Sequence, residues 1–199
     1  DWTYDKVLPY FKKSESVEGL DSNFRGDSGP LKLSRSTNGN ILSQVYLNAA
    51  QQAGYQINND MNGKEQEGFG LMDTTIFNGK RQSTSVTYLH PIKHRSNLEI
   101  LTNVTVNKIL FENKKAVGVE CKANGKNNKY FSTKEVLLSA GAINSPQLLM
   151  LSGIGPEKEL SKHNIEPVEC LEGVGQNLQD HLETYVQYKC KKPVTLHSA

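Results

Sequence analysis

Ala140 and Gly141 are the residues whose type and position indicate a ligand site most directly. They follow a short apolar run, Glu135 to Ser139, which the sequence predicts to be a buried strand. Because both residues have almost no side chain, a bulky ligand can approach the backbone at the carboxyl end of that strand. Cofactors of open α/β sheets bind at such carboxyl ends. The alternative is a strand, turn and helix that serve packing alone, and for an arbitrary α/β protein this is the interpretation that we would favour.

The residues that follow predict a short helix between two turns. Ser145 suits the N-cap, Pro146 the first helical position, and Gly153 the residue past the helix end. Turn-forming and apolar residues alternate closely from Gly141 to Gly155. The length and order of this pattern favour a ligand site over packing alone.

Metal sites are not indicated by the remaining acidic residues and histidines. Asp60 and Asp73 flank a glycine-rich stretch similar to a calcium loop, but the required order of acidic residues, glycine and terminal Glu is not met. The histidines lack metal-ligand spacing, so neither zinc nor iron is expected at His90, His94, His163 or His197. Arg81, just before Ser83 and Thr84, could hold an anion at a helix start, although a structural salt bridge explains it equally well.

The composition is that of an ordinary soluble protein. Of 199 residues, 36% are hydrophobic and 22% charged, and a net charge of +2 gives no reason to expect nucleic acid or electrostatic membrane binding. The sequence contains neither an 18-residue apolar run nor a signal peptide. Cys121, Cys170 and Cys190 are widely spaced and odd in number, which favours reduced thiols in an intracellular protein.

The first half of the chain predicts helices and loops. An amphipathic pattern opens the chain, with Pro9 expected to kink or delay the helix. A helix is predicted from Asn40 to Ala53, closed by Gly54, and a further helix from Ser83 or Thr84 to a point before Pro91.

The second half predicts strands, with one more helix after Pro156. Turn residues at 113–115 and 125–128 separate the predicted strands. The β-rich runs are 98–101, 104–111, 116–121 and 135–139, and the segment 185–190 is also expected to be a strand.

The segment 141–155 resembles the second signature of the glucose-methanol-choline (GMC) oxidoreductases, FAD enzymes that oxidise alcohols. The likeness runs from about Asp1 to Leu196. Within the family, the choline-oxidising branch is the most similar, on the segments 60–73, 79–84, 97–100 and 173–193. The resemblance implies an α/β fold (α+β overall), with part of an FAD-binding Rossmann-like domain, including a β-meander, and part of a substrate domain with an antiparallel sheet.

The resemblance also implies two binding residues beyond Ala140 and Gly141. Val106 would present its backbone N–H and C=O to the adenine of FAD, although the strand pattern alone would make it a core valine. Glu183 would hold the trimethylammonium group of choline, although a lone Glu at a strand start is usually solvated. Such a cation is bound by carboxylate charge and aromatic faces. Strand alternation puts Glu183 and Tyr185 on one side and Tyr188 on the other.

No catalytic residue is assigned within the chain. By resemblance, Asp180 and His181 shape a loop over the flavin, and the catalytic His is expected beyond Ala199. The glycine fingerprint for dinucleotides is also missing, since Gly68-Phe-Gly70 and Gly153-Ile-Gly155 lack its third glycine. We therefore expect an internal fragment that is inactive by itself.

The implied function is oxidation of choline to betaine aldehyde by hydride transfer to FAD, with electrons passed to a membrane-linked acceptor. The protein would lie in the cytoplasm or at the inner membrane. The expected division is 1–95 for substrate-side segments, 96–178 for the centre of the FAD domain, and 179–199 for the start of the substrate-domain sheet. The alternatives are another GMC alcohol oxidoreductase, acting on sugar, aryl or aliphatic alcohols, a GMC-fold lyase, and a non-enzymatic α/β module.

Overall fold

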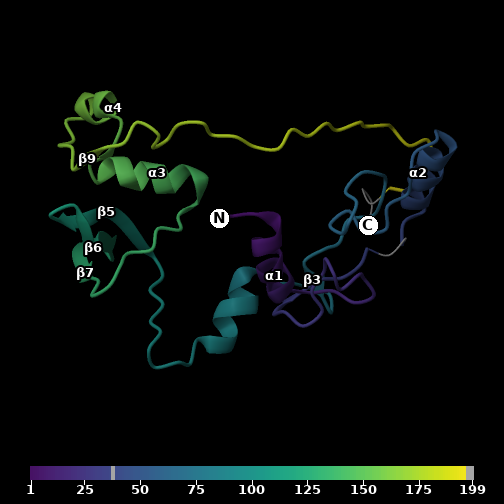
Figure 1. Ribbon diagram of the computed structural model, residues 1–199, viewed down its shortest axis with the longest axis horizontal. Helices are drawn as coiled ribbons and strands as arrows, with labels where there is room; N and C mark the ends of the chain where they lie inside the picture. Colours follow the sequence, from purple (N-terminus) through teal and green to yellow (C-terminus); the bar gives the residue numbers. More distant parts are fainter. Residues whose placement is uncertain (37–38, 196–199) are drawn as a thin grey trace. The chain divides into compact units, whose positions relative to one another are not determined.

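The computed structural model describes residues 1–36 and 39–195 (Figure 1). The chain divides into two compact units. The first contains Asp1–Glu99 together with the chain from Val186 onward, and the second is Ile100–Tyr185. Within the described ranges, no helix has both the length and the apolar character needed to cross a membrane.

The first unit contains two α-helices whose ends follow from their sequences. Helix α1, Tyr4–Ser14, begins before Pro9, so the proline does not delay it. Helix α2, Ile41–Gln52, matches its prediction. The side chain of Asn40 caps it by accepting a hydrogen bond from the amide of Leu42 at 2.8 Å. Gly54 follows the helix with a φ of +88°, a conformation that glycine adopts without strain.

Short strands and tight turns form most of the remaining first unit. Strand β1, Glu15–Ser16, pairs in parallel with β2, Leu31–Lys32. Strands β3, Ile76–Phe77, and β4, Lys80–Arg81, form an antiparallel hairpin.

The helix predicted after Ser83 or Thr84 is partly confirmed. It forms a π-helix, η1, Ser85–Leu89, followed by a 3-10 turn, η2, His90–Ile92. The helical segment therefore does not end before Pro91, because a proline is tolerated near the start of a new helical turn.

A buried cluster of charges, the Arg25 cluster, connects the loops of the first unit. Arg25 is 4% exposed, and its guanidinium pairs with the carboxylates of Glu15, Asp60 and Asp73. Arg35 also lies beside Asp73, with Nε 3.0 Å from Oδ1. Burial lowers the pKa of Arg25, but hydrogen bonding to Glu15 and the charges of Glu15 and Asp60 outweigh it and raise that pKa. The guanidinium therefore stays charged.

The second unit contains a β-meander, as the family resemblance implied. Its strands are β5, Val104–Glu112, β6, Lys115–Ala123, and β7, Lys126–Phe131, in the antiparallel order β5-β6-β7. Two-residue turns with positive φ at both positions join them, Asn113-Lys114 and Asn124-Gly125. Strand β7 was not predicted, because its polar residues 126–128 were interpreted as a turn.

Helix α3, Gly141–Leu151, packs against β5 and begins earlier than predicted. Ser145 is not the N-cap, since the cap is Ala140, and Pro146 lies inside the helix. The hydroxyl of Ser145 instead accepts a hydrogen bond from the amide of Ala140 at 3.1 Å. The prediction for Gly153 is confirmed, because it follows the C-cap Ser152 with a φ of +87°.

Beyond α3, two short strands enclose a helix that matches its prediction. Strand β8, Ile154–Gly155, pairs in parallel with β9, Glu169–Cys170. Helix α4, Glu157–Lys162, lies between these two strands in the sequence. The side chain of Leu160 in α4 is buried, at 1% exposure.

Three predicted strands do not form. Residues 98–101, 135–139 and 185–190 have no strand assignment, and Leu137 is 81% exposed. In each case the apolar pattern is present, but no strand of the described residues pairs with the segment. A β-strand is stable only when a neighbour satisfies its backbone groups, which an apolar pattern cannot guarantee.

Candidate functional site

Val106 and Ala140 line one cavity of about 500 Å³. Strand β5 and helix α3 contribute to its wall, together with the segment 136–140 that leads into α3. The volume is within the usual range of small-molecule sites, which is roughly 300–1,000 Å³. The structure therefore brings together two residues that the sequence assigned separately to cofactor binding.

The cavity lining is mainly apolar and carries no charge. Among the described residues that surround it, none is ionisable, and its polar members include Thr105, Asn144 and Gln147. An apolar cavity with a few amide and hydroxyl groups suits a flat, neutral ring that also forms hydrogen bonds. The adenine of FAD has this chemistry, so these residues fit the cofactor that the sequence implies.

Val106 occupies an edge strand next to an irregularity. It is 39% exposed and lies opposite Cys121 on β6, and the register shifts between Val106 and Lys108. Such a bulge bends a strand and changes the direction of its backbone groups. Among the described residues, β5 pairs with β6 alone, so no strand pairs with its other edge beside Val106.

Ala140 and Gly141 lie at the start of α3, where the chain turns into the helix. Gly141 has a φ of +89°, a conformation in which a side chain is strained. A Cβ placed on Gly141 would meet no atom within 4 Å, so there is open space beside the backbone. The prediction that the two small residues follow a strand is wrong, but Ala140 lines the cavity and Gly141 has open space beside it.

Glu183 lies in an exposed segment that is neither helix nor strand. Its carboxylate accepts a hydrogen bond from the hydroxyl of Tyr185, which raises the pKa of that tyrosine. The two side chains therefore lie on the same side of the chain, as the predicted alternation requires. Glu183 does not line the cavity of Val106 and Ala140, so the structure does not join the two predicted sites into one cavity.

Asp180 and His181 form no acid-base pair. The carboxylate of Asp180 accepts a hydrogen bond from the backbone amide of His181 at 2.8 Å, and both residues are exposed. This contact is local to the backbone and does not orient the imidazole.

The polar part of the cavity lining was not identified from the sequence. Asn144, Gln147, Leu148 and Leu151 all line the cavity from α3. Their spacing of three and four residues puts them on one face of the helix. That spacing is the signal that could have identified Asn144 and Gln147.

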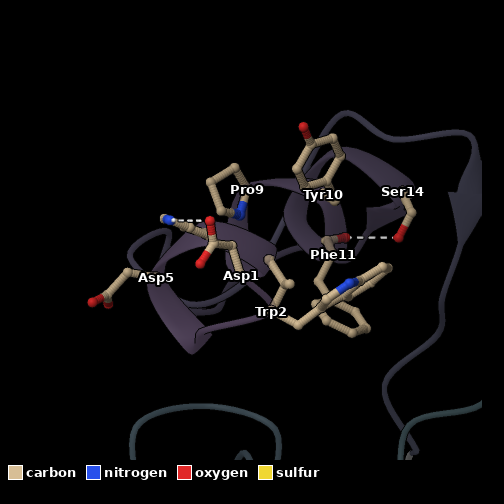
Figure 2. A pocket seen from close by; sticks show the side chains of 9 residues that line it. Asp1, Trp2, Asp5, Pro9, Tyr10, Phe11 and Ser14 are labelled. Carbon is tan, nitrogen blue, oxygen red and sulfur yellow. Dashed lines mark hydrogen bonds and ion pairs between the residues drawn. The ribbon is translucent and has the colours of Figure 1, made fainter.

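A larger hollow, of about 940 Å³, lies along α1 in the first unit (Figure 2). Trp2 and Phe11 lie on one side of the helix in Figure 2, whereas Tyr10 points away from them. Of the described residues, only those of α1 and the segment before it bound this hollow, and Trp2 is 92% exposed. Since no predicted site residue lines it, we interpret it as an open apolar surface.

Curated proteins that are similar to this chain include several named choline dehydrogenases. It is 53% identical to the mitochondrial choline dehydrogenase of Homo sapiens, over all of this chain and 33% of that protein. It is 49% identical to the oxygen-dependent choline dehydrogenase of Staphylococcus saprophyticus, over 98% of this chain and 35% of that protein. The chain thus spans about a third of the length of these relatives.

Solved structures have the same fold, again over about a third of their own length. An FAD-dependent oxidoreductase from Chaetomium thermophilum matches 90% of this chain and 34% of its own, with a TM-score of 0.84 and 32% identity. Pyridoxine 4-oxidase from Mesorbium loti matches 84% of this chain and 33% of its own, with a TM-score of 0.78 and 28% identity. The family model for GMC oxidoreductases matches residues 1–183, and the chain therefore belongs to the GMC oxidoreductase family.

Proposed function

We propose that this chain is part of an FAD-dependent choline dehydrogenase and contributes to both its nucleotide site and its substrate site. The main support is the cavity shared by Val106 and Ala140, which is uncharged and large enough for an adenine ring. The identity to relatives named choline dehydrogenase supports the choice of substrate. When bound, FAD supplies the acceptor for the hydride that leaves the alcohol carbon.

For the nucleotide, the residues of β5 and α3 have separate tasks. The backbone N–H and C=O of Val106 would pair with the edge of the adenine. Asn144 and Gln147 add amide groups on the same wall, and Leu148 and Leu151 exclude water from it. Ala140 and Gly141 leave space beside the backbone for the rest of the cofactor.

For choline, Glu183 would provide the negative charge and Tyr185 an aromatic face. A quaternary ammonium cannot donate a classical hydrogen bond, so it depends on charge and on cation–π contact. Each cation–π contact contributes about 0.5–2 kcal/mol. The hydrogen bond from Tyr185 holds the Glu183 carboxylate beside its ring, so both groups can face one cation.

The experiment that tests this function is Glu183→Gln in the complete enzyme. Two substrates are compared, choline and the neutral alcohol in which a tert-butyl group replaces the trimethylammonium. We expect the KM for choline to rise at least tenfold and the KM for the neutral alcohol to change little. Glu166→Gln is the matched control, because Glu166 is also an exposed carboxylate in the second unit. Equal KM changes for both alcohols would contradict the assignment of Glu183.

A second candidate is a GMC enzyme for another alcohol. It is favoured by the separation of Glu183 from the cavity and by the likeness to pyridoxine 4-oxidase. If Glu183→Gln leaves the KM for choline unchanged while an aryl or aliphatic alcohol is oxidised faster than choline, this second function is the better one.

The electron acceptor belongs to the same proposal. We infer a membrane-linked acceptor, whereas the name of the Staphylococcus saprophyticus relative specifies oxygen. Reoxidation of the substrate-reduced enzyme by air-saturated buffer and by a quinone, followed at the flavin absorbance, separates the two. Faster reoxidation by oxygen would contradict the membrane-linked acceptor.

A further inference from the structure

Ser152, at the carboxyl end of α3, is fully buried, at 0% exposure. Its hydroxyl oxygen accepts a hydrogen bond from the backbone amide of Ile109 at 2.8 Å. The same hydroxyl donates to the carbonyl of Leu148 at 2.6 Å. The side chain therefore joins α3 to β5 through one hydrogen bond, and its second hydrogen bond, to Leu148, lies within α3.

The contact with Ile109 satisfies a buried backbone amide of β5. In the part of the chain that the structure describes, β6 is the one strand paired with β5, and α3 packs against β5. Ile109 is 4% exposed, so water cannot replace a lost partner of its amide. A buried amide without a partner is costly, which makes the position of the Ser152 hydroxyl a strict requirement.

The carboxyl end of α3 is also held by the residue after Ser152. The carbonyl of Gly153 accepts a hydrogen bond from the amide of Val168 at 2.8 Å. A Cβ on Gly153 would lie 2.6 Å from the carbonyl oxygen of Glu166, so the two segments are in close contact. This end of α3 is thus fixed on two sides.

The amino end of α3 is more exposed, and the side-chain hydrogen bond there, between Ser145 and Ala140, is local. Ile143 is 72% exposed, and Gly141 has open space beside it. The helix has 11 residues and is about 16 Å long, so a tilt of about 10° at its fixed end moves the other end by about 3 Å. A displacement of that size would change the distance between Ala140 and Val106 across the cavity.

We propose that Ser152 is a positioning residue for the nucleotide: its buried hydroxyl sets the direction of α3 on β5 and so keeps Ala140 and Val106 on one cavity. This inference rests on the proposed function, in which that cavity binds the adenine part of FAD. Ser152 itself does not line the cavity, and it acts through the helix and the strand that do.

The test measures FAD affinity in the complete flavoprotein, prepared as apoprotein and titrated with FAD. The variants are Ser152→Ala, which removes the hydroxyl, and Ser152→Thr, which keeps it. Ser161→Ala is the control, because Ser161 is an exposed serine of the neighbouring helix α4. Circular dichroism establishes a temperature at which every variant is folded, and the dissociation constant for FAD is determined there by flavin fluorescence.

We expect Ser152→Ala to raise the FAD dissociation constant about tenfold, and Ser152→Thr and Ser161→Ala to change it less than threefold. If Ser152→Ala does not fold, Ser152→Cys takes its place, since a thiol is a much weaker hydrogen-bond acceptor. A lower melting temperature with an unchanged dissociation constant would overturn the proposal, because it would show a role in stability alone.

Ala140→Leu separates this proposal from the proposed function, since it fills the cavity without changing Ser152. Weaker FAD binding in Ala140→Leu but not in Ser152→Ala would overturn the role of Ser152 alone. Unchanged FAD binding in Ala140→Leu would show that the cavity is not the nucleotide site, and both proposals would fail.

Discussion

Arg25 and Asp73 are joined by a hydrogen bond between Nη2 and Oδ2, 3.2 Å long, across 48 positions of the chain. Both side chains are largely buried, at 4% and 9% exposure. Glu15 and Asp60 share the same guanidinium, so the Arg25 cluster connects loops that contain few apolar core residues. Few apolar side chains of the first unit are buried, so the hydrophobic effect contributes little to holding its loops together. The Arg25 cluster supplies a further connection between these loops.

The first prediction is that Arg25→Met destabilises the first unit strongly. It would leave three carboxylates close together and largely without countercharge, and breaking a buried ion pair by removing one partner costs about 3–5 kcal/mol. Urea unfolding followed by circular dichroism measures the change. Arg95→Met is the control, because Arg95 is exposed. A loss no larger than that of the control would show that the Arg25 cluster contributes little.

The second prediction concerns Gly153→Ala. Alanine is strained at the φ of +87° that Gly153 adopts, and its Cβ would lie 2.6 Å from the carbonyl oxygen of Glu166. We expect a loss of stability of about 1–3 kcal/mol, as for other strained backbone positions. Gly173→Ala should be nearly neutral, since a Cβ there meets no atom within 4 Å. Thermal unfolding measures the stability of both variants. Similar melting temperatures for the two would contradict the close contact between Gly153 and Glu166.

The third prediction is a pH dependence of the ion pair between Lys114 and Glu169, which links the β5–β6 turn to β9. The hydrogen bond to Glu169 raises the pKa of Lys114 above its ordinary value of 10.5. Because the folded-state pKa is the higher one, the stabilisation is complete below 10.5 and is lost as the pH rises through the folded-state value. Lys114→Met should therefore lower the melting temperature at pH 8 and have no effect at strongly alkaline pH. Lys158→Met, at another exposed lysine, should show no such pH dependence.

The fourth prediction concerns the thiols, all of which are free. Cys121 is 1% exposed in β6, whereas Cys170 is exposed in β9. A water-soluble maleimide should label Cys170 in the folded protein and reach Cys121 only after unfolding. Mass spectrometry of the labelled peptides measures both, and rapid native labelling of Cys121 would contradict the packing of the meander against α3.

Local sequence determined the elements whose ends depend on neighbouring residues. Asn40 and Gly54 bound α2, and the acidic residues after Pro156 begin α4. The turn at Asn113-Lys114 was also predictable, since asparagine tolerates positive φ. The prediction of Ala140 and Gly141 as ligand-site residues came from their small size, their expected position after a strand and the family resemblance, and the position of Ala140 on a cavity is consistent with it.

Tertiary structure decided the features that depend on partners far away in the chain. The run 135–139 has the composition of a buried strand but lacks a neighbouring strand among the described residues, whereas the polar strand β7 forms because β6 pairs with it. The sequence also could not show that Arg25 gathers three carboxylates or that Ser152 bonds to Ile109. Backbone pairing and burial depend on distances in space, and residue types along the chain do not specify those distances.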